Sequence, residues 1–438
     1  MTQSIVPSFL RGFACLIAAA ILASCESDQE TESNIGPDSE LGLATLQRTI
    51  QVVGGSLNIS HQKNRDRWTQ AAGQADHALG HAQFSDRPTP LWTFAAGQAM
   101  RRGRWTSMEP LIDQGTVYTL SWDQRLSAVD LDTGAAKWQR RLGSKAESDG
   151  VFGGGIAIAN QVLYAATGAG EFHAIEAATG QVIWTVPLPA PSRSGPLVFQ
   201  GTLYVTDILG AITAFDQQGN ELWQEAAPQS ALSILAPNTP AGSDSGLYQV
   251  LPSGVVRALL PSGQAAWQSY AGLQGTSGRS IDLIPGTGAL PVVDGNFLLI
   301  SSWANRSVAL TANTGEVIWD IPIGSAATPL VTNNHVFLIT HDGYMRALQQ
   351  DTGYQVWSTN LRNQQARNQP PVGGWYGPLL AGGTLIVGSS EGALIFLNPR
   401  NGERLHELRV GSPLVAPLSL ADETLLVTTR DGLIRAYR

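Results

Sequence analysis

The 438-residue sequence predicts an all-β chain built from repeated units of about four strands each. Three observations support this prediction. A tryptophan returns at intervals of 38–52 residues, a glycine stands four residues before most of these tryptophans, and short apolar runs separated by Gly, Asn and Asp fill the intervals. A period of this length exceeds one helix or one strand, so it indicates a repeat architecture. The recurring tryptophans are Trp92, Trp138, Trp184, Trp223, Trp267, Trp319 and Trp357.

The glycine of each repeat marks a tight turn. Several of these glycines end an Asp-Thr-Gly or Asn-Thr-Gly sequence, and such residues tolerate the positive φ angles of a hairpin turn. One further glycine, Gly402, is followed at the same offset by His406, where the other repeats carry tryptophan. The glycines of the remaining turns are Gly134, Gly180, Gly219, Gly263, Gly315 and Gly353.

The intervals between the turns supply strands. The fullest copies of the motif, residues 128–138 and 174–184, are preceded by a second apolar run such as residues 162–165. A third run, often opened by proline, comes before that, as in residues 195–198. The runs are short and rich in β-branched and aromatic residues, which favours strands, and none shows sustained helical periodicity. Each period therefore predicts four strands, the content of one propeller blade.

Blades of this kind are expected to pack in a ring, because a single four-stranded sheet cannot bury its own faces. The tryptophans are expected to pack between neighbouring blades, with each indole N–H donating to a backbone carbonyl; stacking against a ligand is the alternative. Seven units run from Gly134 to His406. The strand around Trp92 has no unit before it, and residues 410–438 hold three strands without a fourth. The sequence therefore predicts an eight-bladed β-propeller whose N-terminal strand completes the last blade.

The first residues predict export and anchoring. Residues 1–24 read as a signal peptide, because Arg11 precedes an apolar stretch too short to span a bilayer. The stretch ends in Leu-Ala-Ser before Cys25, which resembles the lipobox of bacterial lipoproteins and implies lipidation of that cysteine; an ordinary signal peptide with a chance cysteine is the alternative. Residues 25–66 are acidic and predict a flexible, lipid-anchored tether. Residues 67–438 form the predicted single propeller domain.

Composition excludes several classes of function. The only cysteines are Cys15 and Cys25, so the body of the chain offers neither a disulfide nor a cysteine metal site. The formal net charge of −8 argues against nucleic acid and anionic lipid surfaces as partners, so the expected membrane contact is through the N-terminal lipid alone.

The chain shows no motif typical of catalysis. It has no nucleophile elbow, phosphate loop, paired carboxylates or nucleotide fingerprint, so we predict no catalytic residues and no cofactor. His77 and His81 have the i, i+4 spacing of a helical metal site, with Asp76 as the nearest third ligand. Gly73 and Gly80 interrupt any such helix. We therefore expect this segment to be an ordered lead-in packed on the propeller, without a metal.

The motif Ala-x-Asp-x-x-Thr-Gly-x-x-x-Trp at residues 128–138 resembles the repeat of pyrroloquinoline quinone (PQQ) enzymes, which are eight-bladed propellers. The resemblance covers roughly residues 90–438 and implies the scaffold. The quinoprotein dehydrogenases also use a vicinal disulfide, which this chain cannot form, together with calcium and a catalytic aspartate in an enlarged site. A periplasmic PQQ-dependent dehydrogenase is therefore kept only as the alternative function.

The lipobox, the acidic tether and the compact blades together resemble the BamB family of the outer-membrane β-barrel assembly (BAM) machinery. Residues 377–394 and 431–438 are most similar to that family, and the lead-in with Trp68, His77 and His81 resembles its alphaproteobacterial members. The resemblance implies a non-catalytic lipoprotein scaffold in the outer membrane, facing the periplasm. It also implies binding of the POTRA domains of the barrel-inserting subunit through inter-blade loops on one rim, beside the other BAM lipoproteins.

Two loops resemble the family's contact surface. The first is residues 188–196, in which Leu188 and Arg193 are the implied contact residues. The second is residues 279–284, with Arg279 and Asp282. An exposed arginine beside apolar groups is typical of an interface anchor, whereas a solvated loop charge is the alternative for Arg193 and Asp282.

Overall fold

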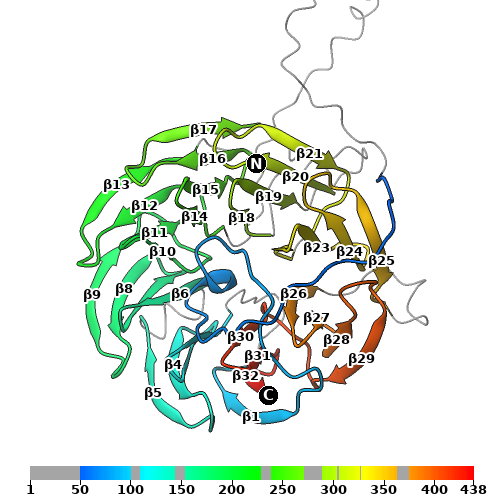
Figure 1. Ribbon diagram of the computed structural model, residues 1–438. Helices are drawn as coiled ribbons and strands as arrows, with labels where there is room; N and C mark the ends of the chain where they lie inside the picture. The colour runs from blue at the N-terminus through cyan, green and yellow to red at the C-terminus, as the bar shows by residue number, and fades with distance from the viewer. Residues whose placement is uncertain are drawn as a thin grey trace, which may run out of the picture. The chain divides into compact units, whose positions relative to one another are not determined.

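The computed structural model describes residues 50–99, 109–143, 153–227, 238–270, 289–302, 305–325, 327–362 and 374–438. These residues form eight four-stranded antiparallel sheets arranged as the blades of a ring (Figure 1). The predicted all-β, eight-bladed propeller is thus confirmed. The described residues contain one short 3-10 helix, η1 (Ala71–Gly73), and none of their helices is long and apolar enough to cross a membrane.

Each blade runs from an inner strand at the ring centre to an outer strand at the rim. Blades 1 to 4 consist of β2 (Leu111–Asp113), β3 (Thr116–Leu120), β4 (Arg125–Asp130) and β5 (Ala136–Arg141); β6 (Gly154–Ala159), β7 (Val162–Thr167), β8 (Glu171–Glu176) and β9 (Val182–Pro187); β10 (Leu197–Phe199), β11 (Thr202–Thr206), β12 (Ile212–Phe215) and β13 (Glu221–Glu225); and β14 (Ala241–Ser243), β15 (Gly246–Val250), β16 (Val256–Leu259) and β17 (Ala265–Ser269).

The other four blades repeat this order, except that the last takes its outer strand from the N-terminal side of the chain. Blades 5 to 8 consist of β18 (Val292–Asp294), β19 (Phe297–Ser302), β20 (Arg306–Thr311) and β21 (Val317–Ile321); β22 (Leu330–Thr332), β23 (His335–Ile339), β24 (Tyr344–Gln349) and β25 (Gln355–Asn360); β26 (Trp375–Ala381), β27 (Thr384–Ser389), β28 (Ala393–Leu397) and β29 (Arg404–Arg409); and β30 (Ser419–Ala421), β31 (Thr424–Thr428), β32 (Leu433–Tyr437) and β1 (Pro90–Ala95).

The pairing of β1 with β32 closes the ring, as the sequence predicts. The two strands are antiparallel, with Trp92 opposite Ala436. Beyond them, Thr89 and Arg438 exchange backbone hydrogen bonds of 2.8 and 3.0 Å. Figure 1 shows β1 beside β32 at the chain's C-terminal end. The ring therefore closes through paired strands, and β32 has no unpaired edge at the point of closure.

Burial along the strands explains why they form. The middle strands are covered on both faces by neighbouring blades, so they are largely buried and rich in apolar residues, as in β19, where every residue is buried. Outer strands such as β9 alternate between exposed and half-buried residues, because one face packs on the next blade and the other meets solvent. The core thus lies between the blades.

Each recurring tryptophan sits on an outer strand and bonds to the next blade. The seven indole N–H groups donate to backbone carbonyls at 2.7–3.1 Å, namely those of Leu131, Ala177, Gln217, Pro261, Ala312, Gln350 and Pro399. The same rings cover the hairpin glycines of the next blade. A Cβ added at Gly180, whose φ is +73°, would lie 2.7 Å from the Trp138 ring. The absence of a side chain at the glycine therefore leaves room for the tryptophan of the preceding blade. It has no such role for the tryptophan four residues later.

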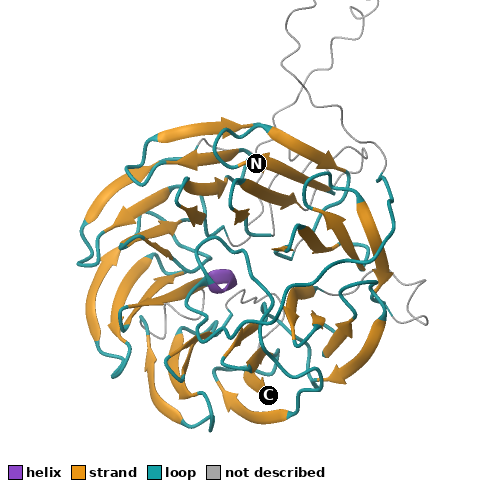
Figure 2. Cartoon of the chain, viewed as in Figure 1, coloured by secondary structure: helices purple, strands orange, loops and turns teal. Residues whose placement is uncertain are grey.

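Residues 50–89, which we call the lead-in, cross from the rim of blade 6 to the centre of the ring and back out to β1 (Figures 1 and 2). The predicted boundary between tether and propeller at residue 66 does not coincide with a structural break. Val53 donates to the carbonyl of Gln355 at 3.0 Å, and Leu57 is buried. The predicted signal peptide, Cys25 and residues 26–49 lie outside the described residues.

Candidate functional site

The ring has two distinct faces, because antiparallel strands turn alternately on opposite sides of each blade. Turns from the inner to the second strand, and from the third to the outer strand, lie on the face that the lead-in crosses; we call it the lead-in face. There Gly382 donates to the carbonyl of Ala82 at 3.1 Å. The connections between blades lie on the opposite face, the connection face, beside the turns from second to third strands. There Leu188 donates to the carbonyl of Gly170 at 2.8 Å.

The lead-in touches all eight blades through hydrogen bonds. On most blades its partners are backbone groups of inner strands or of the turns that follow them. The lead-in therefore links the blades to one another at the centre of the ring. The pairs, in blade order, are Trp68 with Ile112, Thr69 with Ile158, Gln70 with Val198, Ala75 with Gly242, Asp76 with Val293, Gln51 with Gln355, Ala82 with Leu380, and Arg65 with Asp422, at 2.6–2.9 Å.

His77 and His81 of the lead-in contact different blades. The His77 ring is 1% exposed, and its Nδ1 donates to the carbonyl of Pro291 at 2.7 Å; burial lowers the pKa of His77 to about 4, so the ring is neutral. His81 donates from Nδ1 to the carbonyl of Ser60 at 2.6 Å, and its Nε2 accepts from the Gly383 N–H at 3.0 Å. Within the described ranges, no group of three His, Cys, Asp or Glu residues could hold a metal.

Glu109 fixes the centre of the lead-in. Its Oε1 accepts from the Ala72 N–H at 2.5 Å, and its Oε2 accepts from the Trp68 indole at 3.2 Å. Both lead-in residues are buried, and Ala72 has a φ of +50°. Burial raises the pKa of Glu109 to about 8. The carboxyl group therefore holds η1 against the first inner strand, and it resists ionisation.

Glu109 is not among the residues predicted from the sequence, although the repeat contains a signal for it. Seven of the eight inner strands, all but β6, carry a residue followed directly by proline before or near their start, and Glu109 is the one charged residue among these. The others are Gly195, Thr239, Leu290, Thr328, Gly377 and Ala416. A carboxylate at a position that is otherwise small or apolar points to a specific partner, which here is the lead-in.

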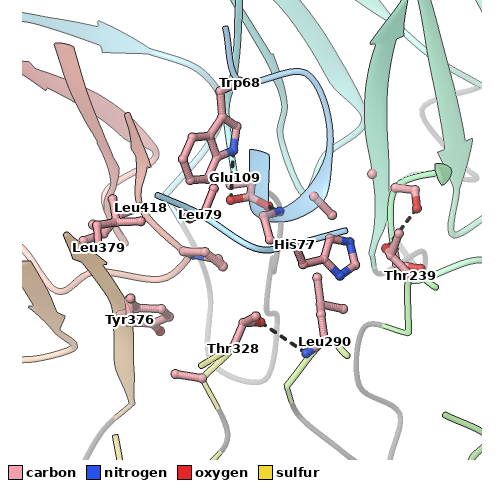
Figure 3. A pocket seen from close by; sticks show the side chains of 18 of the residues that line it. Trp68, His77, Leu79, Glu109, Thr239, Leu290, Thr328, Tyr376, Leu379 and Leu418 are labelled. Atoms are coloured by element: carbon pink, nitrogen blue, oxygen red, sulfur yellow. Dashed lines mark hydrogen bonds between the residues drawn. The ribbon is translucent and has the colours of Figure 1, made fainter. Parts of the chain in front are cut away.

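A cavity of about 420 Å³ lies at the ring centre between the lead-in and the beginnings of the inner strands (Figure 3). Trp68, Ala72 and Leu79 contribute its lead-in side. The inner strands and the residues before them contribute mostly apolar side chains together with a few polar ones. The principal lining side chains from the blades are Glu109, Ile156, Arg193, Thr239, Leu290, Thr328, Tyr376, Leu379 and Leu418.

The predicted contact residues are only partly brought together. Leu188 is half-buried beside the inter-blade core near Tyr164, and Arg193 is half-buried among the residues that line the central cavity. Sequence reasoning missed Leu209, an apolar residue at the tip of the β11–β12 turn that is 66% exposed. That turn is tied to the same loop, because the N–H of Ile208 donates to the carbonyl of Pro191 at 2.9 Å. Arg279 and Asp282 lie outside the described residues.

Comparison with known proteins finds a family match along most of the chain. The model of the family described as outer membrane protein assembly factor BamB matches residues 123–281 and 252–416. Outer membrane protein assembly factor BamB of Yersinia pestis is 25% identical to this chain over 367 residues, which span 81% of this chain and 89% of that protein.

Solved structures share the fold. The crystal structure of BamB from Moraxella catarrhalis matches with a TM-score of 0.67 at 20% identity, and the match covers 80% of this chain and 100% of that one. Quinohemoprotein alcohol dehydrogenase from Comamonas testosteroni matches with a TM-score of 0.64 at 14% identity, covering 85% and 80% of the two chains. At these identities the likeness concerns the propeller alone.

Proposed function

The chain belongs to the BamB family of outer membrane protein assembly factors, and on this premise we propose that it is a non-catalytic scaffold of the machinery that inserts β-barrel proteins into the outer membrane. The observation that carries the proposal is the match of the BamB family model, which spans most of the propeller. A closed ring of eight blades, with the lead-in on one face and the inter-blade connections on the other, supports a role in holding partners.

The proposed partner is the set of POTRA domains of the barrel-inserting subunit, which would dock on the connection face. The lead-in occupies the opposite face, where its hydrogen bonds engage inner strands and their turns. The connection face offers Leu188 together with the exposed Leu209, and an exposed leucine beside polar groups suits an interface core. Arg279 and Asp282 belong to the β17–β18 connection in sequence, and we propose that they extend this contact.

The proposed anchor is a lipid on Cys25, which would hold the scaffold to the outer membrane on its periplasmic side. Because residue 50 already lies against blade 6, only the 24 residues from 26 to 49 would span the gap to the bilayer. Fully extended, a segment of this length reaches about 80 Å. As a flexible coil its mean span is about 25–30 Å. The proposed anchor therefore keeps the ring close to the membrane surface.

A pull-down tests the scaffold function. The full-length protein should co-purify with a POTRA-containing outer-membrane barrel, and Leu209→Glu, Arg193→Glu or Asp282→Arg should reduce recovery of that barrel. Arg400→Glu is the matched control, because Arg400 is an exposed residue on the lead-in face and should leave recovery unchanged. Failure of the wild-type protein to recover any barrel would refute the function. Full recovery by all three variants would refute the proposed contact surface.

The described lining of the central cavity does not suit the dehydrogenase alternative. PQQ carries three carboxylates, and burying them requires several cationic partners. Among the described lining residues, Arg193 is the single arginine or lysine, and the neighbouring Glu109 adds a carboxyl group. We therefore expect no complex when PQQ and Ca²⁺ are added and dye-linked alcohol oxidation is measured. Tight binding with turnover would restore the enzyme hypothesis.

A further inference from the structure

The central cavity is too large to be a packing defect. It is partly open to solvent and measures about 420 Å³, which lies in the range of small-molecule pockets. Figure 3 shows the cavity with Trp68 and Leu79 on one side and Leu379 and Leu418 on another. Apolar walls of this kind bind the body of a ligand without specifying its orientation.

Tyr376 supplies a directional group. It lines the cavity at the beginning of β26, and within the described part of the chain no hydrogen bond engages its hydroxyl. Burial raises the pKa of Tyr376 to about 12, so the phenol stays protonated and can donate at neutral pH. Thr328 lies on the same side of the cavity in Figure 3, where its oxygen already accepts from the Leu290 N–H at 3.2 Å.

The carboxyl group of Glu109 and the guanidinium group of Arg193, which both line the cavity, are already engaged. Both carboxyl oxygens of Glu109 accept hydrogen bonds from the lead-in, and Arg193 also has an interaction within the chain. An ionic ligand would therefore meet mostly apolar walls in which Arg193, already engaged, is the one basic side chain among the described lining residues, so its desolvation, which costs several kcal/mol, would be poorly offset. The cavity therefore favours an uncharged ligand over an ionic one.

We propose that this cavity binds one small, uncharged, largely apolar molecule whose carbonyl or hydroxyl oxygen accepts a hydrogen bond from Tyr376. The site goes beyond the scaffold function, and it does not depend on it. Because Trp68, Ala72 and Leu79 of the lead-in form part of the wall, the complete site exists only while the lead-in is docked. Ligand binding and lead-in docking therefore stabilise each other.

Equilibrium dialysis with a matched pair of probes tests the site. The ketone 2-acetylnaphthalene carries the acceptor oxygen, and 2-isopropylnaphthalene has a similar shape without it. We expect one ketone per chain, and Tyr376→Phe should weaken ketone binding about tenfold while leaving hydrocarbon binding unchanged. The infrared carbonyl band of the bound ketone should shift in the wild-type protein and not in this variant. Tyr270→Phe, at an exposed position, is the matched control.

A filled cavity and a proteolysis experiment complete the test. Ala327→Phe places a larger side chain in the lining and should abolish binding of both probes, with circular dichroism confirming that the propeller folds. Saturating ketone, at about 100 times its Kd, should slow tryptic cleavage after Lys63 about a hundredfold if cleavage requires release of the lead-in. Absence of saturable binding, or binding that survives Ala327→Phe, would overturn the site. An unchanged cleavage rate would overturn its coupling to the lead-in.

Discussion

Docking of the lead-in should weaken as pH rises, because Glu109 must stay protonated where it is buried. The folded pKa of about 8 lies above the ordinary value of 4.5. Below pH 4.5 the group is protonated in both the docked and the released states, so docking is strongest there. Between pH 4.5 and 8 the released state loses its proton first, and docking loses stability progressively. Above pH 8 both states are ionised, and the loss is complete.

The magnitude follows from the pKa difference of about 3.5 units between the docked and released states. At 1.36 kcal/mol per unit, the docked lead-in loses about 5 kcal/mol between pH 4.5 and pH 8. Glu109→Gln removes the titration, although its side-chain amide can accept only one of the two hydrogen bonds from Trp68 and Ala72. The variant should therefore dock with an affinity that is nearly independent of pH.

Limited proteolysis after Lys63, between pH 5 and 9, measures lead-in release when cleavage rates are corrected with an unstructured peptide of the same sequence. The wild-type protein should be cleaved progressively faster toward pH 8, and Glu109→Gln should show a flat profile. Glu391→Gln, at an exposed glutamate, should follow the wild-type profile. Identical pH profiles for the wild-type protein and Glu109→Gln would refute the assignment of the titration to Glu109.

Three further predictions concern the ring. Trp138→Ala should lower the free energy of unfolding by about 3–5 kcal/mol in urea titrations, because it removes an inter-blade ring and its hydrogen bond; a loss below 1 kcal/mol would contradict the packing role. Gly180→Ala should destabilise the protein more than Gly115→Ala, since both glycines have positive φ but only Gly180 faces a ring; equal losses in the same titration would dismiss the steric account. Asp320→Asn should cost about 3–5 kcal/mol, because Arg306 would lose its buried carboxylate, which bonds its Nε at 2.8 Å; an unchanged melting temperature would rule this out.

The ring could be predicted from the sequence because the same glycine and tryptophan motif recurs in successive blades. In each motif the glycine marks a hairpin of one blade, and the tryptophan packs on the corresponding hairpin of the next blade. Counting the tryptophans therefore predicted the number of blades and the closure by β1. His406 shows the limit of such counting. The blade after it has no third-to-outer hairpin, because its outer strand comes from the N-terminal side. His406 stacks on Phe396 at 4.2 Å instead of covering a glycine turn.

The path of the lead-in could not be predicted from its residue types. Most of its partners are backbone N–H and C=O groups of inner strands, and these are the same for almost any side chain. His77 and His81 are four residues apart, and the segment turns between them and sends the two rings to blades 5 and 7, which their spacing alone does not indicate. Glu109 was detectable only by aligning the positions before each inner-strand proline.

The hydrogen bonds between Thr89 and Arg438 join residues 349 positions apart. The outer strand of the last blade, β1, is therefore synthesised long before its partner β32. Until β32 is made, the apolar β1 strand has no sheet to join, and the lead-in has no complete ring to cross. Contacts of such long range make folding slow and leave strand edges open to wrong partners. A chain that stops short of its last strand would therefore lose the closure of the whole ring, not a single edge.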